Sequence, residues 1–120
     1  MAVTETGTRA RQPDASGYAR AYDGLRIYYE VHSSGAPTVV LMTATPISHS
    51  RLWKGQIHFL ARHFRVVVYD GRGNGLSDCP DLDKPLLWRW FTDDCLAVLE
   101  ATQTEAAYLV EPRPKTERVR

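Results

Sequence analysis

Cysteine is scarce in this chain, since only Cys79 and Cys95 occur among its 120 residues. No Cys-x-x-Cys pair and no paired-histidine spacing stands near either of them, which argues against a metal site. We therefore expect two reduced thiols, with Cys95 as a small core residue on a helix and Cys79 in a loop beside Pro80. A disulfide is the alternative, and nothing in the surrounding sequence favours it.

Long apolar runs and an excess of one charge are also absent. No stretch approaches the length needed to span a bilayer, because the longest lies around Val66–Tyr69. The residues 1–17 lack the apolar core of a secretory signal, so a cytoplasmic location is expected. The formal net charge of +1 gives no electrostatic signal for nucleic acid or for an anionic membrane. We expect no nucleic-acid partner, no membrane partner and no cofactor.

Apolar strands alternate with amphipathic helices along most of the chain. The expected elements are a hairpin of Tyr18–Tyr22 and Leu25–Val31 around Asp23-Gly24, a strand at Thr38–Met42, a helix over Trp53–Phe64 capped by Ser48 or Ser50, a strand at Arg65–Tyr69, a helix over Leu87–Leu99 and a strand at Ala106–Val110. This alternation predicts an α/β fold, in which a parallel sheet carries helices on both faces.

Three segments follow from this pattern. Residues 1–17 are polar and without periodicity, so we expect a flexible leader. Residues 18–110 would form the folded portion. Residues 111–120 hold two prolines and six charges and are expected to be a solvated tail that does not extend the sheet.

A glycine-rich segment, Asp70-Gly71-Arg72-Gly73-Asn74-Gly75, follows the strand Arg65–Tyr69. Its G-x-G-x-G spacing differs from the G-x-G-x-x-G of dinucleotide sites, and it has no G-K-[ST]. It also follows a later strand rather than the first strand–helix unit. A structural turn is the favoured interpretation, in which Gly71, Gly73 and Gly75 permit positive φ and Arg72 pins the loop to nearby carbonyls or carboxylates. Nucleotide binding is the alternative.

Taken in order, three stretches resemble the first half of an α/β-hydrolase of the esterase and lipase-like branch. They are V-V-L-M at Val39–Met42, S-H-S-R-L-W-K-G-Q-I-H-F-L-A-R-H-F-R-V-V-V-Y-D-G-R-G-N-G-L-S-D at Ser48–Asp78, and D-D-C-L-A-V-L-E-A-T-Q-T-E-A-A-Y-L-V ending at Val110. The likeness runs from about Tyr18 to Val110, under half of a full family member. It implies a truncated α/β-hydrolase sheet, with an N-terminal hairpin, parallel strands and two crossover helices.

The resemblance also implies ester or related acyl hydrolysis by a serine, an acid and a histidine. In the family the nucleophile stands on a sharp G-x-S-x-G turn after the strand that matches Ala106–Val110, and the acid and histidine come later. Here Glu111, Pro112 and Arg113 follow instead. We therefore expect an inactive fragment without catalytic residues, left by a frameshift, an early stop or a divided gene.

One catalytic element of the family has a counterpart in the chain. The strand matching Thr38–Met42 is often followed by His-Gly, and the next residue donates a backbone N–H to the oxyanion. This chain has Thr43-Ala44-Thr45-Pro46 there, which makes Thr45 the candidate oxyanion donor.

Histidines and serines within the chain are not expected to replace the missing triad. The residues considered are His32, His49, His58, His63, Ser48, Ser50 and Ser77. His49 is a loop residue, His58 and His63 belong to a helix, and Ser77 shares a turn with Asp78.

The alternative function is a non-catalytic interaction module. The strand Ala106–Val110 would leave an apolar edge open, which favours pairing with another chain. The expected partner is either a second copy of the chain or a separate C-terminal half of a hydrolase. Marginal stability of the chain alone is expected for the same reason.

Overall fold

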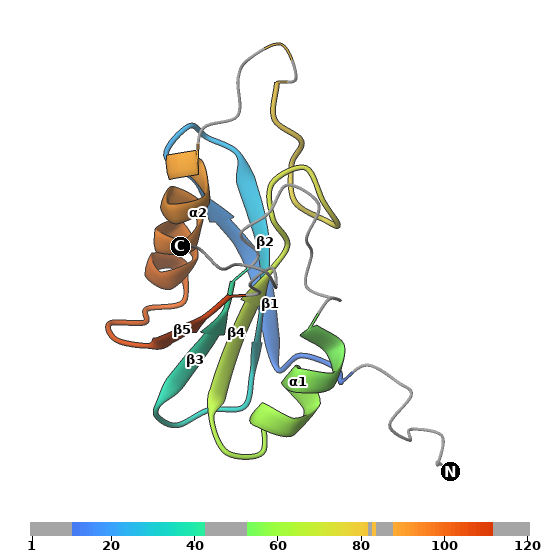
Figure 1. Cartoon of the computed structure of the whole chain (residues 1–120), viewed down its shortest axis with the longest axis vertical. Coiled ribbons are helices and arrows are strands. Elements are labelled where there is room, and N and C mark those ends of the chain that lie inside the picture. The colour runs from blue at the N-terminus through green and yellow to red at the C-terminus, as the bar shows by residue number, and fades with distance from the viewer. Residues whose placement is uncertain (1–10, 43–52, 82, 84–87, 112–120) are drawn as a thin grey trace, which may run out of the picture.

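A computed structural model describes residues 11–42, 53–81, 83 and 88–111 (Figure 1). Its elements are β1 (Ala15–Arg20), β2 (Arg26–His32), β3 (Thr38–Leu41), α1 (Lys54–Leu60), β4 (Arg65–Tyr69), α2 (Trp88–Ala101) and β5 (Tyr108–Val110). Every predicted element is present in the predicted order.

The first strand lies earlier in the sequence than the prediction of Tyr18–Tyr22. The reason is the pairing with β2, in which Ala15 stands opposite Val31 and Arg20 opposite Arg26. The turn between them is wider than the Asp23-Gly24 pair, because the Ala21 N–H donates to the Leu25 carbonyl at 2.8 Å.

The start of α1 also differs from the prediction of a serine cap at Ser48 or Ser50. The residue at the N-cap of α1 is Trp53, and its side chain makes no capping hydrogen bond. Instead the Trp53 indole N–H donates to the Met42 carbonyl at 3.3 Å, which joins the start of the helix to the end of β3. The indole is also buried in the cluster between α1 and the sheet, so Trp53 anchors the first turn of this helix.

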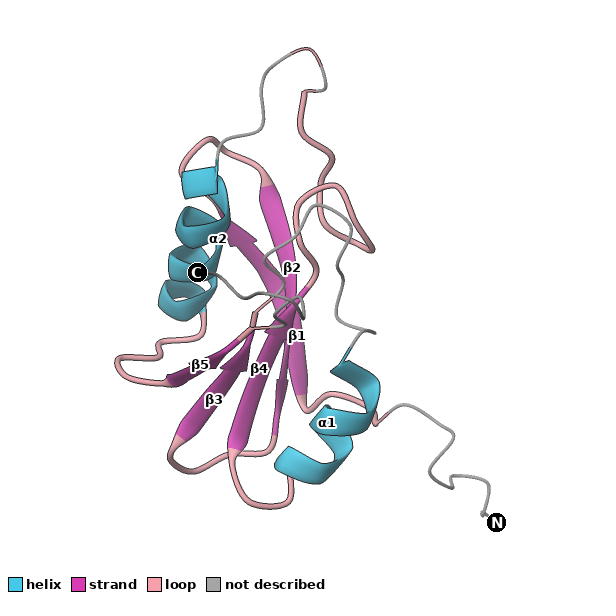
Figure 2. Cartoon of the chain, viewed as in Figure 1, coloured by secondary structure: helices cyan, strands magenta, loops and turns pink. Residues whose placement is uncertain are grey.

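The five strands form one sheet with the order β1-β2-β4-β3-β5 (Figure 2). β2 runs antiparallel to β1 and β4, whereas β3 runs parallel to both β4 and β5. This confirms the predicted fold class, an N-terminal hairpin followed by parallel strands and their connecting helices.

The two helices cover opposite faces of the sheet (Figure 1). Side chains alternate along a strand, so neighbouring residues of β4 point to different helices. Val66 and Val68 pack in the cluster under α1, and Val67 and Tyr69 pack in the cluster under α2. Each fully buried aliphatic side chain of this kind stabilises the fold by about 1.5–3 kcal/mol.

Arg65, the first residue of β4, fastens the end of α2 to the sheet. Its guanidinium donates to the Thr102 carbonyl at 2.8 Å and to the Thr104 hydroxyl at 2.9 Å. A cation at a helix C-terminus also interacts favourably with the helix dipole. Neither described helix has the length and apolarity to cross a membrane.

Candidate functional site

The carboxyl ends of β3, β4 and β5 meet at one edge of the sheet, which is where open α/β sheets bind ligands. Met42 follows β3, Asp70 follows β4 and Glu111 follows β5. The Met42 N–H donates to the Val110 carbonyl at 2.7 Å, so the ends of β3 and β5 lie side by side. Residues at this edge are therefore the first candidates for chemistry.

The segment Asp70–Asp78 forms a turn closed around the Asp70 carboxylate. Asp70 Oδ2 accepts a hydrogen bond from the Leu76 N–H at 2.9 Å. Gly75 has φ +53°, and a Cβ there would lie 2.2 Å from the same oxygen. Only glycine fits this position without displacing the carboxylate. The turn encloses a negative charge, which would repel a phosphate group.

Ser77 and Asp78 fasten this turn to β2. The Ser77 hydroxyl donates to the Asp70 carbonyl at 2.7 Å and accepts from the Tyr28 N–H at 2.8 Å. Asp78 accepts from the Arg26 backbone N–H at 2.9 Å and from its guanidinium at 3.1 Å. The bonds from Arg26 lower the pKa of Asp78. Both side chains thus hold the loop in place.

Arg72 is the buried centre of the loop, with 3% of its surface exposed. Its guanidinium donates to both carboxylate oxygens of Asp94 on α2, at 2.6 and 2.8 Å. It also donates to Asp23 in the β1–β2 turn at 2.9 Å, and lies 4.8 Å from the ring centroid of Trp90. One side chain therefore joins three separate segments of the chain.

The pKa values in this cluster follow from burial and ion pairing. Burial alone would lower the pKa of Arg72, but its hydrogen bonds to Asp94 and Asp23 raise it above the ordinary value, so the guanidinium is charged. Burial raises the pKa of Asp94, and the bonds from Arg72 oppose this. The hydrogen bond from Arg72 lowers the pKa of Asp23. The cluster is a structural ion network, since its charges are directed at one another.

The residues considered for an improvised triad are dispersed. Thr45, Ser48, His49 and Ser50 lie outside the described residues. His58 and His63 are exposed on and after α1. His32 is fully buried on β2, where Nδ1 lies 3.0 Å from Arg11 and Nε2 lies 3.2 Å from Glu30. Ser77 bonds to Asp70 and Tyr28, as given above. Among the described residues, no group of three or more metal-ligating side chains could hold an ion.

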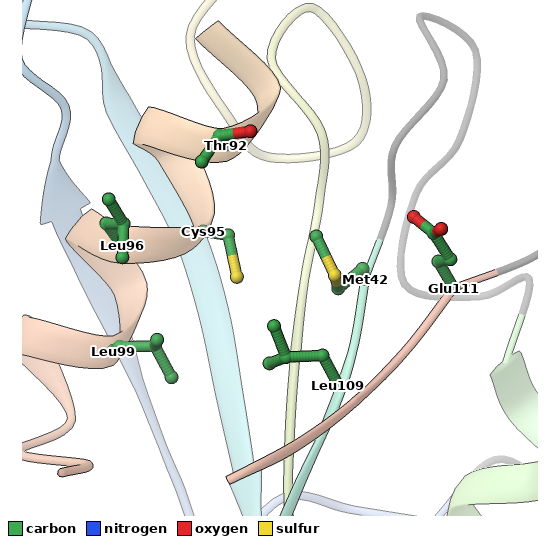
Figure 3. A pocket seen from close by; sticks show the side chains of 7 residues that line it. All are labelled: Met42, Thr92, Cys95, Leu96, Leu99, Leu109 and Glu111. Atoms are coloured by element: carbon green, nitrogen blue, oxygen red, sulfur yellow. The ribbon is translucent and has the colours of Figure 1, made fainter. Parts of the chain in front are cut away.

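A pocket of about 340 Å³ lies between α2 and the ends of β3 and β5 (Figure 3). Its walls are mostly apolar, with Thr92 and Glu111 as the polar exceptions; the lining residues are Met42, Thr92, Cys95, Leu96, Leu99, Leu109 and Glu111. Leu109 and Met42 project from the strands toward Cys95 on the helix. The pocket is suited to an apolar side chain rather than to acid–base chemistry.

Sequence reasoning missed the partners of Arg72 and the lining of this pocket. Asp94 could have been found, because it stands one position before Cys95 on the buried side of α2, and a carboxylate there needs a cation. Asp23 gave no such signal, since turns commonly contain aspartate.

Both cysteines are free thiols, and they differ in burial. Cys79 is exposed, whereas Cys95 is buried and burial raises the pKa of its thiol. We expect one thiol of the folded chain to react rapidly with a disulfide reagent and the second to react only in denaturant. A Cys79→Ser variant should lose the rapid reaction. Equal reaction rates of the two thiols in the folded chain would contradict the structure.

Known proteins of one fold match part of this chain. No protein-family model matches the chain. The "Probable oxidoreductase EphD" of Mycobacterium tuberculosis is 44% identical over 79 residues, which are 64% of this chain and 13% of that protein. An alpha/beta hydrolase from Sphaerobacter thermophilus superposes with a TM-score of 0.68 and 29% identity, covering 79% of this chain and 35% of the other. The enol-lactonase of Burkholderia xenovorans LB400 superposes with a TM-score of 0.68 and 27% identity, covering 79% of this chain and 36% of the lactonase.

The sheet order and these likenesses define the class: the chain has an α/β-hydrolase fold. It matches part of that fold, which confirms the resemblance to α/β-hydrolases seen in the sequence. The chain spans about a third of the length of the solved hydrolases and a smaller share of EphD.

Proposed function

We propose that the chain supplies the N-terminal scaffold of an α/β-hydrolase that acts on esters or related acyl bonds, and that these 120 residues are inactive by themselves. The scaffold contributes the sheet edge, the Asp70–Asp78 loop and, at Thr45, one backbone donor for an oxyanion. Thr45 lies outside the described residues, so its role rests on the family resemblance. A cytoplasmic location remains a prediction.

The residues after β5 carry the proposal of inactivity. Aligned directly after Val110, the five positions of G-x-S-x-G are occupied by E-P-R-P-K. Arginine replaces the nucleophile, and no glycine is available for the strained turn. The position after the nucleophile, which donates the second oxyanion N–H in the family, is Pro114, and proline has no N–H. Nucleophile and second donor are thus both lost.

Inactivity is tested with a p-nitrophenyl ester and with a fluorophosphonate, which labels an activated serine. We expect turnover by the purified chain to equal that of a variant with alanine at all six serines. The mass of the chain should not change after fluorophosphonate treatment. Because the hydroxyls of Ser33 and Ser77 make structural hydrogen bonds, to the Ala61 carbonyl and with Tyr28, the fold of the variant must be checked by circular dichroism. Labelling of any serine in the unaltered chain would refute the proposal by itself.

A second candidate function is a non-catalytic interaction module. The observation that favours it is the exposure of all three side chains of β5, which are 67%, 53% and 40% exposed at Tyr108, Leu109 and Val110. An apolar strand at the edge of a sheet is a surface on which another strand can pair.

A further inference from the structure

His32 is a buried histidine at the end of β2, and it contacts one basic and one acidic side chain. Its ring is fully buried, with 0% of the residue exposed. Nδ1 lies 3.0 Å from a guanidinium nitrogen of Arg11, and Nε2 lies 3.2 Å from Glu30 Oε1. Both separations are those of hydrogen bonds. His32 belongs neither to the Asp70–Asp78 loop nor to the pocket, so its contacts need a separate explanation.

These two contacts determine which nitrogen of the His32 ring carries a proton. A guanidinium has donors only and keeps its charge in proteins, so Arg11 must donate and Nδ1 must accept. The proton of the neutral ring is therefore on Nε2, which donates it to the Glu30 carboxylate. Glu30 also accepts from the Tyr28 hydroxyl at 3.1 Å. In the structure the ring is thus neutral and has one defined tautomer.

Arg11 belongs to the segment that precedes β1, and this segment is fastened to β2 in two ways. The side chain of Arg11 is 29% exposed and donates to His32. Asp14 bonds to the backbone instead: its N–H donates to the Val31 carbonyl at 2.9 Å, and its carboxylate accepts from the Ser33 N–H. The Arg11 contact requires an unprotonated ring nitrogen, whereas the Asp14 contacts do not. Protonation of the histidine can therefore break the first without the second.

We infer that His32 is a pH-dependent anchor for Arg11. While the ring is neutral, Nδ1 holds Arg11 against the end of β2. A proton from solvent that binds Nδ1 takes the lone pair that accepted from Arg11, and it places an imidazolium beside a guanidinium. The Arg11 side chain then moves into water, and Asp14 stays bonded to Val31 and Ser33. Histidine side chains ordinarily gain a proton between about pH 8 and pH 5, which is the range for this change.

The charges around His32 determine which contact is lost on protonation. Glu30 stays bonded to Nε2, and its attraction to the ring increases when the ring becomes charged. The hydrogen bond from the Ser33 N–H, with smaller contributions from the charges of Arg11 and His32, lowers the pKa of Asp14. A second carboxylate near the ring is therefore ionised in the same pH range. Both anions favour the imidazolium, and Arg11 is the group that opposes it.

The other elements packed on this face of β2 add no charged group bonded to the ring among the described residues. Val66 of β4 stands opposite His32 and is fully buried, and Ser16 of β1 stands opposite Glu30. The charged and titratable side chains of α1 and the turn after it are all exposed, where solvent and salt screen them; they are Lys54, His58, Arg62 and His63. The balance at the ring is thus set by Arg11 and Glu30.

The tautomer of His32 is tested by nitrogen NMR of the whole chain, because protonated and unprotonated ring nitrogens differ in chemical shift. Correlation to its own backbone distinguishes His32 from the other histidines. Above about pH 8 we expect a proton on Nε2 and none on Nδ1. A neutral ring with its proton on Nδ1 would overturn the inference, since Arg11 could not then donate to that atom.

Two arginine substitutions test the coupling between Arg11 and the ring. Arg11→Met removes the donor and its charge, so His32 should bind a proton at least about threefold more tightly in an NMR titration. Arg20→Met removes a cation from β1 whose guanidinium donates to the Gly24 carbonyl at 2.8 Å, and it should leave the titration of His32 unchanged. If Arg11→Met titrated like the native chain, the proposed anchor would be refuted.

Release of Arg11 is measured separately, by heteronuclear NOE of the backbone amides. As His32 gains a proton, the values for Arg11 and Gln12 should fall, whereas those from Ser16 onward should not, because Asp14 keeps its bonds. In His32→Gln, which gains no charge, Arg11 and Gln12 should show no change between about pH 8 and pH 5. If that variant does not fold, the native chain alone decides: unchanged mobility of Arg11 while His32 titrates would contradict release.

Discussion

Replacing Arg72 with methionine is expected to lower the free energy of unfolding by about 3–5 kcal/mol, the usual result of removing one partner of a buried ion pair. Asp94 is 1% exposed and receives two hydrogen bonds from Arg72. Without the guanidinium, its carboxylate would be buried and unpaired. A typical domain has a total stability of only about 5–15 kcal/mol, so this change is a large fraction of it. Urea unfolding followed by circular dichroism measures the loss.

Two comparisons separate the buried ion pair from charge in general. Arg89→Met removes a cation from α2, the helix that carries Asp94, but Arg89 is exposed and lies 3.8 Å from Asp93. That change should alter stability by less than about 0.5 kcal/mol. An Arg72→Met/Asp94→Leu variant removes both buried charges and should recover much of the loss. If Arg72→Met lowered the free energy of unfolding no more than Arg89→Met does, the ion network of Arg72 with Asp94 and Asp23 would not stabilise the loop.

The effect of Arg72→Met should also depend on pH. Because Arg72 lowers the pKa of Asp23, that contact stabilises the native chain above the unfolded value of about 3.9 and is lost as the pH falls. Burial raises the pKa of Asp94, so the unpaired carboxylate in the variant is disfavoured when ionised and relieved by protonation. As the pH falls, the native chain loses the Asp23 contact and the variant loses the penalty at Asp94, so both changes reduce the stability difference between the two proteins. The difference between the free energies of unfolding of the native chain and the variant should shrink as the pH falls, first as Asp94 of the variant is protonated and then, below about 3.9, as Asp23 is protonated.

Much of the fold could be predicted because local patterns determine it. Continuous apolar runs such as Val66–Tyr69 indicate strands buried on both faces, and the spacing of Trp53, Ile57 and Ala61 indicates a helix. The position of β1 was harder to predict, because its bounds depend on pairing with β2 rather than on its own residues. The strand begins at Ala15, inside a segment whose polar composition suggested a leader.

The site was less predictable, because its contacts join residues far apart in the sequence. The glycine spacing indicated a turn, and Arg72 was expected to pin it. Its partners lie 49 and 22 positions away, at Asp23 and Asp94, and no local pattern links them. The expectation that no nucleophile turn follows Val110 rests on the identity of five consecutive residues, most of which lie outside the described residues, so it stays a prediction. Thr45 remains a prediction outside the described residues.

Replacing Gly75 with alanine is expected to destabilise the chain by about 2–5 kcal/mol, through two separable effects. The left-handed backbone conformation at φ +53° costs a residue with a Cβ about 1–2 kcal/mol. The new Cβ would also meet Asp70 Oδ2 at 2.2 Å. The carboxylate must then move and release the Leu76 N–H, at a cost of about 1–3 kcal/mol for a lost partner. Urea unfolding of the variant measures the sum.

Two other glycines separate these effects. Gly24 has φ +93°, and no heavy atom lies within 4 Å of the place where a Cβ would stand, so Gly24→Ala reports the backbone cost alone. Gly55 is helical and also has open space around it, and Gly55→Ala should raise stability by about 0.5–1 kcal/mol. The expected order of stability is Gly55→Ala, then Gly24→Ala, then Gly75→Ala. If Gly75→Ala lowered the free energy of unfolding no more than Gly24→Ala does, the Asp70 carboxylate would not be fixed inside the turn.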